Sequence, residues 1–361
     1  MRIGFTLSRH IGWTLAKTTL VIFGVFIVLV SIIDFTQLAR FIGTAGMTAG
    51  TAIAVSFLRG PSLAESVLPF AVLFGAMITF VQLNRRLELT VARSAGVSAW
   101  QMLLPAGIVA FLVGLLAITV YNPAAVALRE LSVPLGGAFV RTASFGEGGQ
   151  VWLRQNGDDG PSIIGALRSR NNGTSLAGGV TAFVFADDGT LRLRVDARTA
   201  DLEGDEWVMN RAVVTPVGAP AREGEQFRLH TNLTAAQINE SLADPATVAF
   251  WRLPGLIEIA RQTALPATDL RMQLSTLVSL PILLVAMVLI AAVVSLRFSR
   301  TLHIGRLAIA GAASGFMLYL LLVVSGDLGR SGIVPPGIAA WAPVILAMLV
   351  SVSLLLRTED G

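Results

Sequence analysis

Long apolar runs separated by short polar segments occupy both ends of the chain. The predominantly apolar stretches are 11–37, 61–83, 99–121, 270–296, 307–324 and 333–356. An α-helix needs about 20 such residues to cross a hydrocarbon core of roughly 30 Å. The pattern therefore predicts six membrane-spanning helices. The first, roughly 40 Å long at 1.5 Å per residue, should tilt or protrude.

The stretch between the third and fourth apolar runs has a different period. Over 191–197, apolar residues alternate with arginine and aspartate, which is typical of a strand with one dry face. Phe183 and Phe185 alternate in the same way before the turn at 187–189, so 181–197 should form a hairpin. Further strands are expected at 150–154, 162–168, 206–215 and 226–231. They predict an antiparallel β domain with either a packed core or an open groove for an apolar ligand.

Composition supports a membrane protein. Hydrophobic residues make up 54% of 361 positions and charged residues 14%, and the mean hydropathy is +0.71, which is too apolar for an ordinary soluble protein. The net charge is +4, yet residues 123–269 carry 13 Arg against 17 Asp or Glu. The positive charge thus belongs to segments that flank the apolar runs. This distribution is typical of membrane topology rather than of nucleic-acid binding.

Basic residues also predict the orientation of the spans, because cytoplasmic loops are enriched in Lys and Arg. Ten fall on one side and three on the other: Arg2, Arg9, Lys17, Arg85, Arg86, Arg93, Arg297, Arg300, Arg306 and Arg357 against Arg40, Arg59 and Arg330. Both termini should be cytoplasmic and the β domain outside. The first apolar run lacks a small-x-small cleavage site after it, so we expect an uncleaved span rather than a signal peptide.

Two further segments lie between predicted spans. Residues 41–58 are moderately apolar but interrupted by glycines, and Arg59-Gly60-Pro61 should close them. We expect a helix lying on the outer surface there, with the second span beginning at Pro61.

Residues 84–98 form a polar island on the basic side. An apolar residue recurs every fourth position from Leu83 through Leu87 and Val91 to Ala95, and Gly96 stands where a C′ glycine would end a helix. Ser98 and Gln101 match a capping box for the next helix. An amphipathic helix of this kind would contact a cytoplasmic partner. The same residues would equally suit a basic connector that follows the topology rule.

Motifs for catalysis, metals and cofactors are missing from the sequence. Its single lysine, Lys17, has no neighbouring glycine to complete a phosphate-binding loop. There is no cysteine, and the three histidines, His10, His230 and His303, lack metal-ligand spacing. We therefore expect no catalytic residues, metal or cofactor.

Charged residues within the spans gather near the outer ends: Asp34, Arg40, Glu65, Asp327 and Arg330. A carrier driven by an ion gradient would place acidic groups near the midplane. An apolar midplane instead suits a lipid cavity with charges at its rim. Ordinary interfacial anchoring is the alternative role for each of these residues.

One stretch resembles a known family. Glu88-Leu-Thr-Val-Ala-Arg-Ser-Ala-Gly96-Val-Ser is similar to the E-L-x-x-x-[RQ]-x-[AS]-G-x-[ST] signature of the lipopolysaccharide-export permeases, the LptF/LptG (YjgP/YjgQ) family. Supporting stretches are Pro69 in the second span, Gln150–Arg154, 191–200, Trp207–Met209, Thr231–Thr234, Gly315–Tyr319, Pro335-Pro336 and Trp341. Thr231–Thr234 and Pro335-Pro336 resemble the LptG branch.

The resemblance implies a fold and a function. The fold would be transmembrane helices 1–3 in 1–122, a periplasmic β-jellyroll-like domain in 123–268 and helices 4–6 in 269–361. Such a chain would be a permease subunit in the bacterial inner membrane. Its partners would be a cytoplasmic ABC ATPase dimer, an LptF-like second permease, an LptC-like membrane-anchored jellyroll protein and lipopolysaccharide.

By the same resemblance, 84–98 would be the coupling helix seated in the ATPase, through Arg85, Arg86, Leu87, Glu88, Val91, Arg93 and Gly96. Phe316 and Tyr319 would contact acyl chains. Some family members carry a base near the outer end of the first span, where this chain has Asp34, and Arg40 is the nearest substitute.

The sequence leaves two other functions open. A membrane-anchored periplasmic receptor or assembly factor would use the β domain to bind and the helices only as an anchor. A lipoprotein-release permease fits less well, because that class typically has four spans.

Overall fold

The computed structural model describes residues 5–40, 42, 48–88, 91, 94, 96, 98–143, 151–157, 160–170, 175–186, 189–231, 247–262, 267–298 and 304–359. The chain forms two compact units. One comprises Met1–Ser132, Ala249–Ile257 and Thr268–Gly361, and the other comprises Val133–Val248 and Glu258–Ala267.

The first unit is helical. Its elements are α1 (Phe5–Ala39), α2 (Ala49–Ala64), the 3₁₀-helix η1 (Glu65–Val67), α3 (Leu68–Arg85), α5 (Ala99–Leu116), the π-helix η2 (Ala117–Tyr121), the first part of α6 (Asn122–Ala143), the 3₁₀-helix η4 (Phe250–Arg252), the first part of α8 (Leu253–Gln262), α9 (Thr268–Phe298), α10 (Ile304–Arg330) and α11 (Pro336–Glu359). Among the described residues, six helical stretches are long and apolar enough to cross a membrane. The prediction of six spans is confirmed.

The second span is longer than predicted. It runs from Ala49 to Arg85, because α2, η1 and α3 follow one another without a break. The helix begins at a capping box formed by Thr48 and Thr51, and Pro61 lies inside α2. The prediction that Arg59-Gly60-Pro61 ends a separate helix and that Pro61 begins the next was therefore wrong. Residues 41 and 43–47 of that segment lie outside the described residues.

Close approach between α1 and the second span explains why Gly60 does not end α2. A Cβ at Gly60 would collide with the Ser31 side chain of α1, and a Cβ at Gly75 of α3 would come within 3.0 Å of the Thr19 backbone. Small residues permit such packing between membrane helices. Thr18 of α1 adds hydrogen bonds across this interface, 2.9 Å to the Thr79 hydroxyl and 3.1 Å to the Gly75 carbonyl.

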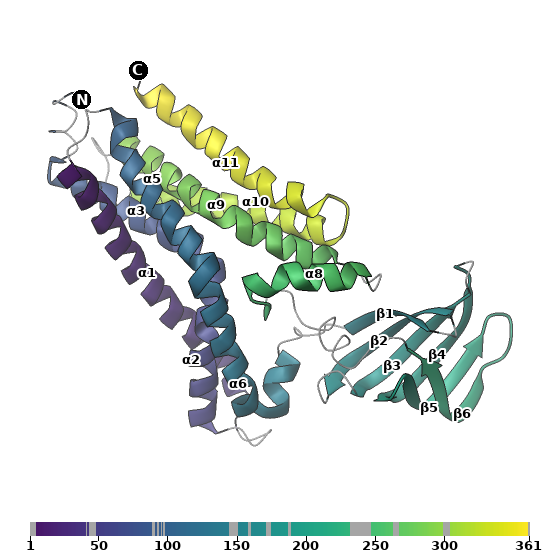
Figure 1. Ribbon diagram of the computed structural model, residues 1–361. Coiled ribbons are helices and arrows are strands. Elements are labelled where there is room, and N and C mark those ends of the chain that lie inside the picture. Colours follow the sequence, from purple (N-terminus) through teal and green to yellow (C-terminus); the bar gives the residue numbers. More distant parts are fainter. Residues whose placement is uncertain are drawn as a thin grey trace. The chain divides into compact units, whose positions relative to one another are not determined.

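Helix α9 is the most enclosed of the six spans. It contacts α3, α5, α10 and α11. Gly114 of α5 allows this packing, because a Cβ there would come within 2.5 Å of Pro281 in α9. The N-terminal end of α1 and the C-terminal end of α11 lie at the same end of the helical unit (Figure 1). An even number of crossings requires this arrangement.

The second unit holds one antiparallel sheet. Its strands are β1 (Val151–Gly157), β2 (Gly160–Arg170), β3 (Ser175–Phe185), β4 (Leu191–Glu203), β5 (Glu206–Pro216) and β6 (Arg222–His230), paired in sequence order. The hairpin predicted at 181–197 is present, with Thr181 opposite Asp196. Six spans with an antiparallel sheet inserted between the third and fourth match the predicted fold class.

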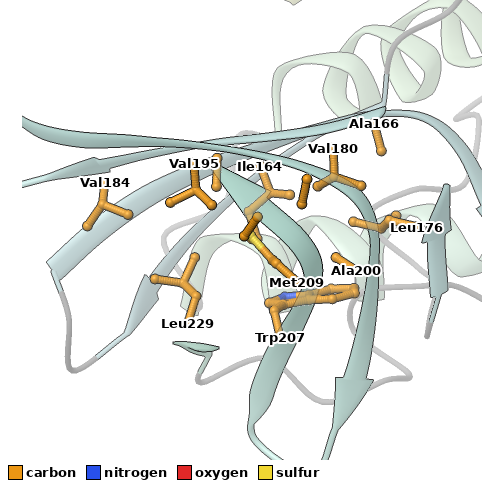
Figure 2. Packing of buried hydrophobic residues seen from close by; sticks show 13 residues of the cluster. Ile164, Ala166, Leu176, Val180, Val184, Val195, Ala200, Trp207, Met209 and Leu229 are labelled. Carbon is orange, nitrogen blue, oxygen red and sulfur yellow. The ribbon is translucent and has the colours of Figure 1, made fainter. Parts of the chain in front are cut away.

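The sheet curls around a packed core. Thirteen buried residues from β2 to β6 fill its concave side, among them Trp207 and Met209, both fully buried (Figure 2). Gln155 of β1 ties opposite edges together: its Oε1 accepts from Trp207 Nε1 at 3.1 Å, and its Nε2 donates to the His230 carbonyl at 3.2 Å. The sequence allowed either a packed core or an open groove, and the described residues form a packed core.

The two phenylalanines of the hairpin do not join this core. Ala182 and Val184 of β3 are the buried residues, whereas Phe183 lies opposite Arg194, whose guanidinium stands 5.7 Å from its ring centroid. Phe183 therefore lies on the face opposite the core. Alternation shows that two faces exist, but the register with β4 decides which one is covered.

Candidate functional site

The 84–98 segment is not one continuous helix. Helix α3 ends at Arg85, and Leu87 adopts a left-handed φ of 58°, which is costly for a residue other than glycine. Leu83 is buried within α3, while Leu87 and Val91 are 62% and 65% exposed. The apolar stripe predicted from Leu83 onward is therefore divided by a sharp bend, and Leu87 and Val91 face outward.

Beyond the bend, the described residues agree with a short helix. Glu88, Val91 and Ser94 are helical, and the Val91 N–H donates to the Leu87 carbonyl at 2.9 Å. Gly96 has the left-handed φ of 80° that a C′ glycine requires. The capping box of Ser98 and Gln101 is confirmed at the start of α5. Arg93 and Ala95 lie outside the described residues.

The exposed side of this segment combines positive charge with apolar surface. Arg85 and Arg86 are exposed beside Leu87 and Val91. Glu88 is partly covered instead, because its Oε2 lies 3.4 Å from Nε2 of His10 on α1. The predicted coupling residues that are described are therefore close in the chain and mostly available to a partner.

Asp34 and Arg40, predicted at the lipid rim, occupy different environments. Arg40 is exposed just beyond α1. Asp34 is buried between α1 and α2, where its Oδ1 lies 3.7 Å from Nη2 of Arg59, and each of the two side chains is 7% exposed. Within the described structure, Asp34 Oδ2, Arg59 Nε and Ser56 Oγ have no hydrogen-bond partner. Asp34 therefore holds two helices together in this structure, and the sequence did not indicate Arg59 as its partner.

A second polar cluster joins three segments that are distant in the sequence. The amide of Asn122, which is fully buried, donates to both carboxylate oxygens of Glu65 at 3.1 and 3.0 Å. Its Oδ1 accepts from the Phe250 N–H at 2.8 Å. One side chain thus connects η1, the start of α6 and the segment that returns from the β domain.

The helices on either side of this cluster are irregular. Glu65 begins the 3₁₀-helix η1, and Asn122 follows the π-helix η2, a type of distortion that is frequent at functional sites. Tyr121 donates to the Pro61 carbonyl at 2.7 Å, and Trp251 Nε1 donates to the Thr119 carbonyl at 3.1 Å. The sequence indicated Glu65 as a charged residue at a span end, but it did not indicate Asn122. The dipeptide Asn122-Pro123 directly after an apolar run was the available signal.

Phe316 and Tyr319 lie on an uncovered face of α10. They are 56% and 41% exposed, and the Tyr319 ring packs against Phe70 of α3 with centroids 5.7 Å apart. Helix α1 has a similar uncovered face along its length, formed by Leu20, Val21, Val25, Val28, Leu29, Ile32 and Ile33. These two helices are the least covered of the six spans.

Comparisons with known proteins identify the family of this chain. The family described as "Lipopolysaccharide export system permease LptF/LptG" matches residues 9–357. The lipopolysaccharide export system permease protein LptG of Escherichia coli K12 is 24% identical over 97% of this chain and 98% of its own length. LptG of Haemophilus influenzae is also 24% identical, over 98% and 99%. The chain therefore belongs to the LptF/LptG family of lipopolysaccharide export permeases.

Proposed function

We propose that this chain is a permease subunit of an ABC transporter that extracts lipopolysaccharide from the bacterial inner membrane and passes it to a periplasmic bridge. The observation that carries the proposal is the family match over 9–357, together with relatives named LptG that align over nearly their full length. The six apolar spans and the inserted sheet suit such a subunit.

The energy would come from a cytoplasmic ABC ATPase dimer. This chain has a single lysine, Lys17, and no phosphate-binding loop. The 84–98 segment would seat in the ATPase through exposed Arg85, Arg86, Leu87 and Val91. The partly exposed Glu88 would contribute as well, with Arg93 and Gly96 completing the surface. This assignment requires both termini to be cytoplasmic and the β domain to be periplasmic, as the basic residues predict.

The uncovered apolar faces of α1 and α10 are suited to contact a second subunit and to line a lipid cavity. An LptF-like second permease would face them, and Phe316 and Tyr319 would contact acyl chains. Arg40 is exposed and available for a headgroup, whereas Asp34 is engaged with Arg59. Headgroup binding at this end would therefore depend on Arg40 rather than on Asp34. An LptC-like jellyroll protein would receive the lipid.

The test is to co-express the chain with the ATPase and the second permease and to purify the complex in detergent. We expect Glu88→Ala and Arg86→Glu to abolish ATPase association and lipopolysaccharide release while each variant stays folded in the membrane. Arg357→Glu is the matched control, because Arg357 is also exposed in the last turn of α11.

Normal release by the Glu88→Ala/Arg86→Glu double variant would contradict the coupling role. A stable chain that purifies alone and never associates with a nucleotide hydrolase would contradict the transporter assignment. That second result would favour a membrane-anchored receptor.

A further inference from the structure

The 84–98 segment is joined to the first span by one described side-chain pair. Of the described residues from Arg86 to Gly96, Glu88 is the one whose side chain forms an ion pair or hydrogen bond with another helix. Its partner His10 lies near the beginning of α1. The bend at Leu87 directs Glu88 away from the axis of α3, so the pair links the segment after the bend to a different span.

Helix α1 is long and continuous. It is one uninterrupted helix of 35 residues without proline, about 52 Å long at 1.5 Å per residue. Asp34, close to its other end, pairs with Arg59, and Thr18 between them bonds to α3. Helix α1 thus contacts the 84–98 segment at one end and α2 at the other.

The same helix has the least covered apolar surface of the six spans. A shift of α1 would therefore alter surface that faces lipid or a neighbouring subunit rather than a packed interior. Motion of the 84–98 segment has a direct contact through which to reach that surface, namely the one between Glu88 and His10.

We propose that His10 is a positioning residue that couples the 84–98 segment to α1, so that nucleotide-driven motion of a partner ATPase displaces the helix with the uncovered face. The proposal rests on the proposed function. It adds to it a residue outside the family signature and a direction of transmission from Glu88 to α1.

A merely structural role makes a different prediction. The side chains of His10 and Glu88 are 46% and 29% exposed, and exposed pairs of this kind contribute little to folding stability. Loss of the His10 side chain should therefore leave folding and ATPase binding intact. If His10 couples motion, the quantity that falls is the lipopolysaccharide released per ATP hydrolysed.

The experiment uses the complete complex of ATPase and both permeases in proteoliposomes that contain rough lipopolysaccharide. His10→Leu removes the imidazole, and His10→Gln keeps an N–H donor near the position of Nε2. Arg9→Gln is the matched control, because Arg9 is exposed on the same helix end and its loss changes the charge but not the pair. ATPase co-purification, ATP hydrolysis and lipopolysaccharide release are measured for each variant.

We expect His10→Leu to keep the ATPase bound and hydrolysing while release per ATP falls roughly fivefold, equivalent to about 1 kcal/mol of coupling. His10→Gln should recover most of the loss, and Arg9→Gln should resemble the unaltered complex. Equal release per ATP by His10→Leu and Arg9→Gln would overturn the proposal, as would parallel loss of ATPase binding and release in His10→Leu. Neither result would affect the test of Glu88 and Arg86, so the two proposals fail separately.

Discussion

The β domain and the helical unit place polar and apolar residues in opposite ways. In the β domain, Trp207, Met209 and Leu229 are fully buried, and charged pairs such as Arg194 with Asp196 lie on the outside. In the helical unit, Leu20 is 73% exposed while Asn122 and Thr79 are fully buried. The β domain is arranged for water and the helical unit for lipid.

The difference shows what each unit must satisfy. In water, burial of apolar surface stabilises a fold, and exposed polar groups cost little. In lipid, apolar side chains gain little by burial because the lipid tails are equally apolar. The helices therefore associate through close packing and interior hydrogen bonds. The Asn122 cluster and the Thr18 contacts therefore contribute to the helical unit what the Trp207 core contributes to the sheet.

The largest expected effect comes from removing Asn122. Asn122→Leu would remove a fully buried amide and leave the partly buried Glu65 carboxylate and Phe250 N–H without this partner, at a cost of about 4 kcal/mol. In the β domain, Asn210 donates to Asp201 at 3.3 Å on a half-buried surface, where water can replace it, so Asn210→Leu should cost about 1 kcal/mol or less. Thermal unfolding in nanodiscs measures both changes. Equal losses would contradict the proposed difference between the units.

Two exposed valines, one in each unit, test whether the helical unit faces lipid and the β domain faces water. Val25 of α1 and Val217 after β5 are 59% and 64% exposed. Val25→Asp should reduce membrane insertion by about 3 kcal/mol, because a carboxylate would enter the hydrocarbon core. Val217→Asp should stay within about 0.5 kcal/mol of the unaltered protein. A protease-protection insertion assay measures the first and thermal unfolding the second, and a harmless Val25→Asp would place that face of α1 in water.

The smallest effect is expected at Thr18. Thr18→Val removes the hydrogen bonds to α3 with little change of shape and should cost about 0.6 kcal/mol, the average for such bonds between membrane helices. Thr14→Val is the control, since the Thr14 hydroxyl bonds within α1 to the His10 carbonyl at 2.8 Å. A difference in unfolding midpoint between the two variants isolates the contribution from the contact between helices.

Periodicity was sufficient to predict elements but not their partners. The six spans, the hairpin at 181–197 and the capping box at Ser98 follow from patterns within a few neighbouring residues, and all are present in the structure. The helix through Gly60 and Pro61 was mispredicted, because these residues usually end a helix in isolation. Here the fit against Ser31 of α1 requires a glycine at position 60.

The candidate site was predicted in part for the same reason. A local pattern indicated the 84–98 segment, and the family resemblance indicated Phe316 and Tyr319. The contact of His10 with Glu88 and the role of Asn122 depend on residues that are up to 128 positions apart. A single sequence carries no record of such pairings.

By itself, the sequence determined the solvent of each region, because hydropathy and period respond directly to lipid and water. It determined six spans, an inserted antiparallel sheet and the absence of an ATPase motif. The tertiary structure decided which face of β3 is covered, that Asp34 is held by Arg59, and which helices keep uncovered faces. These outcomes depend on which surfaces meet, and packing between distant segments selects among alternatives that are equally compatible with the local pattern.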